Sequence, residues 1–218
     1  MKIVNLEWDI LPAVLYEVLL SRMAAGGIFV PLQSPGVYLL IHWNGERYQI
    51  YYAGAAAGPV GDQLVRHYRK YAGEEKSDSW LPRSAELFNG DIHRLFRNNS
   101  GTDFVREGPD FPRGLRRSVG RAIMGKTYFA FAKVAPNSLD RLTVIEAVLH
   151  HGLLRKNYGE DYVRFMHGWF GEGKAKLPPD VDLTIRNTGP NAPVEKMIFS
   201  SLPRKIVLVK GQLSISRR

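Results

Sequence analysis

Glu146 is the residue whose surroundings in the sequence most strongly indicate chemistry. It lies in LTVIEAVL, which has the spacing of a helix. The apolar residues of this helix fall on one stripe, made of Leu142, Ile145, Leu149 and Leu153. Glu146 falls inside the same stripe, and a carboxylate facing a core is costly unless it is paired, protonated or bound to a cation. A buried ion pair with an arginine and a metal site both explain this position.

His150 follows Glu146 by four residues, the distance at which two side chains meet on one face of a helix. The spacing allows a Glu146/His150 metal pair. A neutral histidine at a helix edge is more often an ordinary surface residue, and this is the interpretation that we expect for His150.

Tyr38, Tyr51 and Tyr52 are three of the four tyrosines in GVYLLIHWNGERYQIYYAG, residues 36–54, which predicts a β-hairpin with its turn at residues 44–45. A two-residue turn pairs Tyr38 with Tyr51 and directs Tyr52 to the opposite face. A three-residue loop, or a bulge elsewhere in the arm, directs Tyr38 and Tyr52 to the same face. Strand propensity alone explains tyrosines here, so the register decides whether they can act together.

Basic side chains gather in two places along the sequence. A segment without acidic residues holds Arg113, Arg116, Arg117, Arg121 and Lys126, and glycines interrupt it. Flexible glycines and guanidinium groups suit contacts with phosphate, although a solvated loop has the same composition. The helix predicted over residues 60–72 carries a second basic group made of Arg66, Arg69 and Lys70. Both groups are candidate nucleic-acid contacts.

The composition of the 218-residue chain agrees with an anionic partner. Lys and Arg outnumber Asp and Glu by 30 to 21, which gives a net charge of +9. There is no cysteine, which excludes disulfides, zinc–thiolate sites and a cysteine nucleophile. We expect a cytoplasmic protein without a membrane partner, because no apolar run approaches the roughly 20 residues of a membrane span and the N-terminus lacks a secretory pattern.

The elements that must position these residues indicate an α+β fold: a small antiparallel sheet, made of the hairpin and a further strand, flanked by helices. The predicted helices cover residues 9–26, 60–72 and 137–153, and the predicted strands lie within 126–135, 180–187 and 204–211. We expect an N-terminal helical extension (1–30), a core with inserted loops (31–200), and a C-terminal strand and tail (201–218).

These pieces, in this order, resemble the GIY-YIG nuclease family. GVY at 36–38 is similar to the first signature, and YAG at 52–54 is similar to the second. Arg66 in DQLVRHYRKY matches the arginine of the following helix, and Glu146 matches the glutamate of the later helix. The final asparagine matches Asn187 in TIRNTGPN, with Asn191 as the alternative, so the resemblance covers roughly residues 35–191.

The resemblance implies a metal-dependent DNA endonuclease with a GIY-YIG-like core. Glu146 would hold one Mg²⁺ or Mn²⁺, and Tyr38 would position or deprotonate the attacking water. Arg66 would stabilise charge on the phosphate, Tyr52 would hydrogen-bond around the site, and Asn187 would be a supporting donor. The length of the chain, its lack of cysteine and its expected cytoplasmic location look most like the restriction-endonuclease branch. This branch implies a sequence-specific enzyme acting on double-stranded DNA, and symmetric cutting would call for a homodimer.

Three positions depart from the family pattern. Ala55 stands where many members have lysine, and Lys70 stands where many have a histidine four residues after the arginine, although His67 is nearby. Arg69 is an alternative to Arg66 if the preceding loop is longer. These departures leave a non-catalytic nucleic-acid-binding protein with a degenerate GIY-YIG fold as the alternative.

Overall fold

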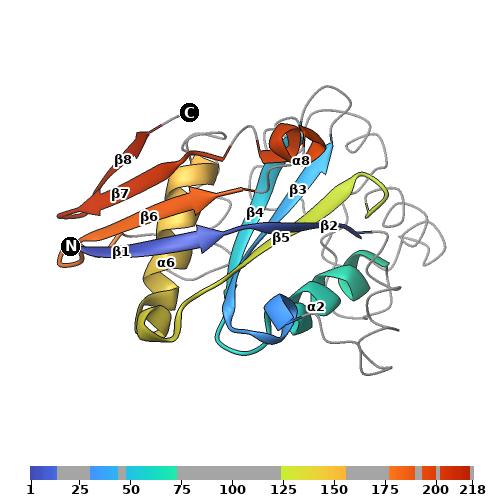
Figure 1. Cartoon of the computed structure of the whole chain (residues 1–218), viewed down its shortest axis with the longest axis horizontal. Helices are drawn as coiled ribbons and strands as arrows, with labels where there is room; N and C mark the ends of the chain where they lie inside the picture. The colour runs from blue at the N-terminus through green and yellow to red at the C-terminus, as the bar shows by residue number, and fades with distance from the viewer. Residues whose placement is uncertain are drawn as a thin grey trace, which may run out of the picture.

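The part of the chain that the structure describes is a mixed α/β arrangement with two small sheets and few helices (Figure 1). The computed structural model describes residues 1–13, 30–43, 48–72, 124–155, 177–189, 193–199 and 202–216. Within these ranges, no helix has the length and apolar character that crossing a membrane requires. The predicted sheet of the hairpin and a further strand is present, and a second sheet joins both ends of the described chain.

The tyrosine sheet, as we call the first of the two, is antiparallel and carries the predicted hairpin. Its strands, in spatial order, are β2 (Asp9–Pro12), β5 (Thr127–Lys133), β3 (Gly36–Trp43) and β4 (Tyr48–Ala56). Alternate residues of a strand point to opposite faces. In β3 both sets are buried, so elements must cover the sheet on both sides.

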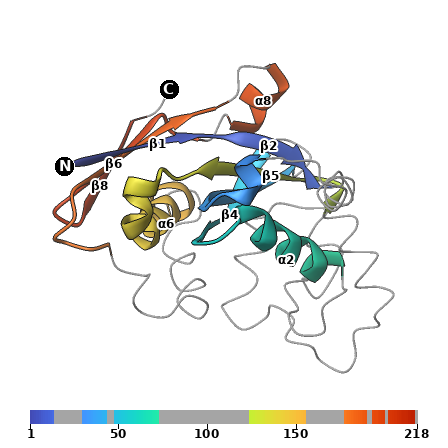
Figure 2. The ribbon, with the colours of Figure 1, turned by 60° about the horizontal axis from the view of Figure 1, so that its bottom comes forward.

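One face of the tyrosine sheet is covered by α2 (Val60–Ala72), together with the short helix η2 (Val30–Gln33), and Figure 2 shows α2 on the side away from β1. The helix confirms the prediction for residues 60–72. Val60, Leu64 and His67 are buried along it, at the spacing of one helical stripe. This stripe faces Tyr38, Leu40 and Tyr52 of the hairpin.

The other face of the tyrosine sheet packs against a helical segment of three types. The segment begins with the 3₁₀ helix η3 (Pro136–Arg141), continues as α6 (Leu142–Leu149) and ends as the π-helix η4 (His150–Arg155). We predicted one continuous helix from Asn137, whereas the first turn is 3₁₀ and the last is π. The apolar stripe of α6 enters the larger core, which also contains residues of both sheets.

The terminal sheet, as we call the second, contains both ends of the described chain. Its strands, in spatial order, are β1 (Lys2–Glu7), β6 (Leu183–Thr188), β7 (Lys205–Val209) and β8 (Gln212–Ser216). Strands β1 and β6 are parallel and the other pairs are antiparallel. Strands β6 and β7 confirm two sequence predictions. The short helix α8 (Pro193–Ile198) lies between these two strands in the sequence.

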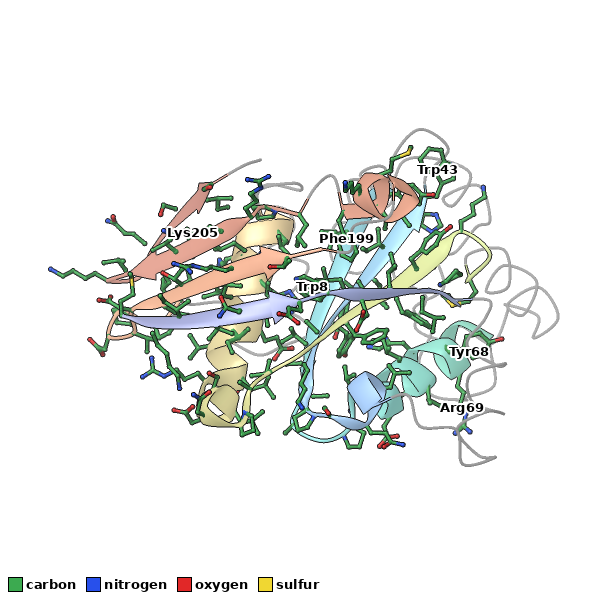
Figure 3. The ribbon with its side chains drawn as sticks, viewed as in Figure 1. Trp8, Trp43, Tyr68, Arg69, Phe199 and Lys205 are labelled. Atoms are coloured by element: carbon green, nitrogen blue, oxygen red, sulfur yellow. The ribbon has the colours of Figure 1, made fainter. Side chains whose placement is uncertain are left out.

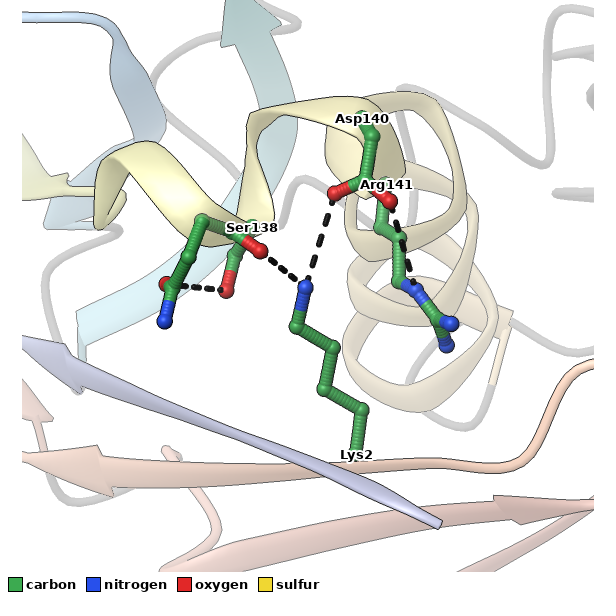
Figure 4. Close-up of polar contacts among 5 residues, drawn as sticks. Lys2, Ser138, Asp140 and Arg141 are labelled. Carbon is green, nitrogen blue, oxygen red and sulfur yellow. Dashed lines mark hydrogen bonds and ion pairs between the residues drawn. The ribbon is translucent and has the colours of Figure 1, made fainter.

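Lys2 links the terminal sheet to the start of the helical segment. Its Nζ donates a hydrogen bond to the Asn137 carbonyl oxygen and lies 3.5 Å from Oδ1 of Asp140 (Figure 4). The other Asp140 oxygen lies 3.7 Å from Nε of Arg141. Asp140 is exposed and the other two side chains are partly exposed, so we assign these ion pairs a modest contribution to stability and a role in fixing β1 beside η3.

The helix predicted to begin at Asp9 is wrong at its start. Asp9–Pro12 form β2, where Asp9 pairs with Phe131 and Pro12 with Tyr128. The apolar letters of this segment fit either a strand or a helix, and pairing with β5 satisfies the backbone polar groups in the extended form. The remainder of the predicted helix, from residue 14 to residue 26, lies outside the described residues.

Candidate functional site

A β-bulge in the hairpin brings Tyr38 and Tyr52 together. Leu40 pairs with Tyr52 but Ile41 pairs with Ile50, so Tyr51 is an extra residue in β4. The bulge places Tyr38 and Tyr52 on the same face, where their rings stack with centroids 5.9 Å apart. The predicted alternative with a bulge in the arm is therefore confirmed.

Two glycines of the tyrosine sheet make this arrangement possible. Tyr38 pairs with Gly54, and a Cβ at Gly54 would lie 2.3 Å from Cζ and 2.4 Å from the hydroxyl oxygen of Tyr38. A Cβ at Gly36 would lie 2.3 Å from the carbonyl oxygen of Ala132 on β5. Each glycine therefore permits a close approach that any side chain would prevent.

His67 reaches Tyr38 from α2 and is a residue that the sequence analysis did not include in the site. Its Nε2 lies 3.0 Å from the Tyr38 hydroxyl oxygen, which is hydrogen-bonding distance. Its ring centroid lies 5.0 Å from that of Tyr52. Its position three residues after Leu64 on the buried stripe of α2 was the signal for this inward orientation.

Glu146 and His150 approach the tyrosines from the helical segment. Glu146 is 6% exposed, and its Oε1 lies 3.9 Å from Nε2 of His150. The His150 ring lies edge-on to Tyr52 at a centroid distance of 6.0 Å. The expectation that His150 is a surface residue is wrong, because it is 6% exposed where α6 and η4 contact β4.

The pKa of Tyr38 is shifted by its burial and by the side chains around it. Burial raises the pKa of Tyr38 well above its ordinary value near 10, a hydrogen bond with Tyr52 lowers it, the charge of Glu146 raises it and the charge of Arg66 lowers it. At neutral pH Tyr38 is therefore a neutral phenol. It can donate its proton to Nε2 of His67 when that nitrogen is unprotonated.

Of the two candidate arginines on α2, Arg66 is the one whose charge acts on Tyr38. Both Arg66 and Arg69 are exposed, and Arg69 extends away from the tyrosine sheet (Figure 3). Lys70 lies within α2, and its side chain is outside the described part of the structure. The effect of its charge on the pKa of Tyr38 favours Arg66 as the arginine of the site.

Asn187, the predicted supporting donor, lies elsewhere. It is on β6 of the terminal sheet, where its Oδ1 accepts a 3.0 Å hydrogen bond from Nε1 of Trp8 and its Nδ2 donates a 2.8 Å bond to the Pro203 carbonyl oxygen. Trp8 belongs to the large core, whereas Tyr38 faces the smaller core on the α2 side. The amide of Asn187 therefore joins parts of the terminal sheet, and Asn191 is outside the described residues.

Little of the predicted basic loop falls within the described chain. Lys126 is exposed in the turn before β5, and the charge of Lys126 lowers the pKa of His42 after the larger effect of burial. The remaining members are outside the described residues: Arg113, Arg116, Arg117 and Arg121. Their role in binding nucleic acid stays a prediction.

The donor set at Glu146 fits a divalent cation held by few protein ligands. In the described ranges, no three His, Asp or Glu side chains gather as a metal-binding cluster. Mg²⁺ is commonly bound through one or two carboxylates and completes its shell with water and phosphate oxygens. A single buried carboxylate beside an imidazole is compatible with that mode of binding.

Comparisons with known proteins leave the family open. No protein-family model matches the chain, and neither a curated protein nor a solved structure matches it. The GIY-YIG resemblance stays a prediction that depends on the motifs quoted above.

Proposed function

We propose that this protein is a metal-dependent endonuclease that hydrolyses phosphodiester bonds of DNA. The observation that carries the proposal is the 3.0 Å contact between Tyr38 and His67 in the field of the buried Glu146 carboxylate. Phosphodiester hydrolysis needs an activated water, stabilisation of charge on the phosphate oxygens and orientation of both. Residues with these abilities meet at the bulged hairpin.

Tyr38 and His67 form a route for the proton of the attacking water. A neutral Tyr38 is a poor base, since burial raises its pKa. In the proposed reaction the phenol passes its proton to Nε2 of His67 as it takes one from the water. The hydrogen bond with Tyr52 and the positive charge of Arg66 favour the transient phenolate, because both lower the pKa of Tyr38.

Arg66 and Glu146 would act on the phosphate. The exposed Arg66 side chain lies where it can bind a substrate phosphate while its charge still reaches Tyr38. Glu146 would hold one Mg²⁺ or Mn²⁺, and the bound ion would supply positive charge to the phosphate oxygens. Burial of Glu146 keeps this carboxylate oriented and away from bulk water.

The substrate class is inferred from charge and from the motifs. A net charge of +9 favours a polyanion, and the GIY-YIG resemblance favours DNA. We propose double-stranded DNA cut at a specific sequence, as in the restriction branch. A two-fold dimer would place one site on each strand.

Incubation with plasmid and phage DNA, with Mg²⁺ or Mn²⁺ and end mapping of the fragments, tests the proposal. We expect the wild-type protein to cut, and Glu146→Gln and Arg66→Ala to lose about 10² to 10³-fold in rate, the scale of a removed electrostatic contribution. The matched controls are Asp140→Asn, an exposed acid just before α6, and Arg186→Ala, an exposed arginine on β6, and both should cut normally.

Two results would overturn the proposal. DNA binding that weakens steeply with salt, without cutting under any metal condition, would replace it with the non-catalytic nucleic-acid-binding protein. Equal cutting by the wild type and Glu146→Gln would assign the activity to a different site.

A further inference from the structure

We propose that His150 is a second protein ligand of the cation held by Glu146, so that the site prefers Mn²⁺ and similar first-row transition ions to Mg²⁺. The inference deepens the proposed function, because it concerns the ion of the same site. It depends on an imidazole that neither the sequence motifs nor the family resemblance assigns to metal binding. The evidence is the position, the distance and the packing of the two side chains.

Glu146 and His150 have the geometry of a two-residue metal site on one helix. They are four residues apart, and the His150 N–H bonds to the Glu146 carbonyl oxygen, so both side chains occupy one face. Oε1 and Nε2 are 3.9 Å apart. Two neighbouring ligand atoms of one octahedral ion with bonds of about 2.1 Å lie about 3.0 Å apart, so the two atoms would have to approach by about 0.9 Å. Small side-chain rotations would place both atoms on one ion.

A direct contact between the two groups is a weaker explanation of this pair. A charge-assisted N–H···O bond spans about 2.8 Å, which is much less than the observed 3.9 Å. Protonating His150 to form an ion pair would place a second charge at a position that is only 6% exposed. A divalent cation between the two atoms would pair with the Glu146 carboxylate and bind a neutral His150, and a substrate phosphate would balance its second charge.

The surroundings of His150 hold its ring in place. Tyr52 lies edge-on to the imidazole at 6.0 Å and 86°, which restricts rotation about the side chain. The helix also changes from α to π at His150, and π segments within helices are frequent at functional sites. The ring is therefore oriented before an ion arrives.

An imidazole ligand changes which ions the site favours. A carboxylate with water and phosphate suits Mg²⁺ and Mn²⁺ alike, whereas imidazole nitrogen binds Mn²⁺ and the later transition ions better than Mg²⁺. We expect the wild-type protein to bind Mn²⁺ more tightly than Mg²⁺, and this difference to be lost in His150→Gln.

Metal binding to the full-length, metal-free protein without DNA tests this inference. The probe is Mn²⁺, followed by calorimetric titration and by pulsed electron paramagnetic resonance, which detects a directly bound imidazole nitrogen. We expect that nitrogen signal in the wild type and in His151→Gln, the adjacent histidine that serves as the control. His150→Gln should lose the signal and bind Mn²⁺ at least about tenfold more weakly, since even outer partners of metal ligands contribute that much.

The outcomes separate this inference from the proposed nuclease. Mn²⁺ bound without a nitrogen signal would overturn the role of His150, and so would an unchanged signal in His150→Gln. Neither result would contradict the proposed nuclease, because cleavage that depends on Glu146 does not require His150 as a ligand. No Mn²⁺ binding at millimolar concentration would also overturn the inference, and the cleavage assay would then decide the nuclease proposal independently. If His150→Gln fails to fold, His150→Asn and ¹⁵N-histidine labelling of the wild type provide the same test.

Discussion

The two sheets bury polar side chains in opposite ways. In the terminal sheet, Asn187 is neutral and its amide is hydrogen-bonded at both ends, to Trp8 and to Pro203. Beside the tyrosine sheet, two of its tyrosines meet three titratable side chains from the helices that cover it. The five residues are Tyr38, Tyr52, His67, Glu146 and His150. A satisfied neutral network stabilises a fold, whereas grouped titratable residues cost stability and are typical of functional sites. Substitutions in the two sheets should therefore separate stability from activity.

The largest effect should come from Tyr38→Phe in the tyrosine sheet. It removes the hydroxyl that lies 3.0 Å from His67, so the cleavage rate should fall by about 10² to 10⁴-fold, the range of a lost proton-transfer group. The free energy of unfolding should fall by only about 1 kcal/mol, because the ring packing is kept and one buried hydrogen bond to His67 is lost.

Tyr128→Phe is the matched control for Tyr38→Phe. Tyr128 lies on β5 of the same sheet and packs against the opposite core, so this variant should cut at the wild-type rate. Plasmid cleavage and urea unfolding measure the two properties. A fully active Tyr38→Phe would contradict the assignment of activity to the titratable residues beside the tyrosine sheet, because the Tyr38 hydroxyl would then not take part in catalysis.

Asn187→Ala should produce the opposite result in the terminal sheet. It leaves Nε1 of Trp8 and the Pro203 carbonyl oxygen without their buried partner, so we expect a loss of about 3 kcal/mol in unfolding free energy. Cleavage per folded molecule should stay within about twofold of the wild type. Asn5→Ala, an exposed asparagine on the neighbouring β1, is the control and should be nearly neutral in urea unfolding. A loss of cleavage without a loss of unfolding free energy would support the predicted role of Asn187 as a donor in the catalytic site.

Local sequence patterns predicted the strands of the tyrosine sheet and the helices that cover it better than they predicted the register and packing between them. The turn signal at residues 44–45 and the tyrosine-rich arms predicted the hairpin, and the helical spacing predicted α2 and the buried face of α6. The bulge at Tyr51 could be posed only as an alternative, because turn type and register depend on packing. The basic residues of α2 pointed to its exposed side, whereas His67 lies on the buried side, at helical spacing from Val60 and Leu64.

Long-range pairing explains what the sequence left open in the terminal sheet. Strand β1 pairs in parallel with β6, a partner about 180 residues away, and no local pattern encodes such a register. The same limit explains the wrong prediction for Asp9–Pro12. Its apolar residues fit a helix or a strand, and pairing with β5 makes it a strand. Asn187 was assigned by motif order alone, and its hydrogen bonds show a structural use of the same residue type.

Gly54→Ala sharpens the comparison within the tyrosine sheet, because it moves Tyr38 without removing it. The new Cβ would lie 2.3 Å from Cζ of Tyr38, so the ring must shift, at a cost of about 2 kcal/mol in unfolding free energy. Cleavage should fall as the contact between Tyr38 and His67 lengthens. Gly58→Ala is the matched control, since nothing lies within 4 Å of its added Cβ. Wild-type stability in Gly54→Ala would mean that Tyr38 is not held over this glycine.

The smallest effect concerns His42, a buried titratable residue of the tyrosine sheet outside the site. Its Nδ1 lies 3.3 Å from the Thr127 hydroxyl oxygen, and burial, followed by the charge of Lys126, lowers the pKa of His42 from 6.5 to about 4. Between these values the unfolded chain binds a proton that the folded protein excludes, so acidification destabilises the fold. From pH 7 to pH 5.5 this amounts to about 1 kcal/mol.

The contribution of His42 is isolated by comparing the wild type with His42→Gln in urea unfolding at both pH values. The wild type should lose about 1 kcal/mol more than the variant, because only His42 differs between them. Cleavage at pH 7 should be equal, since His42 is neutral there and lies near the opposite end of β3 from Tyr38. Equal acid sensitivity of the two proteins would show that His42 charges without unfolding, and that burial in this sheet tolerates a histidinium even away from the site.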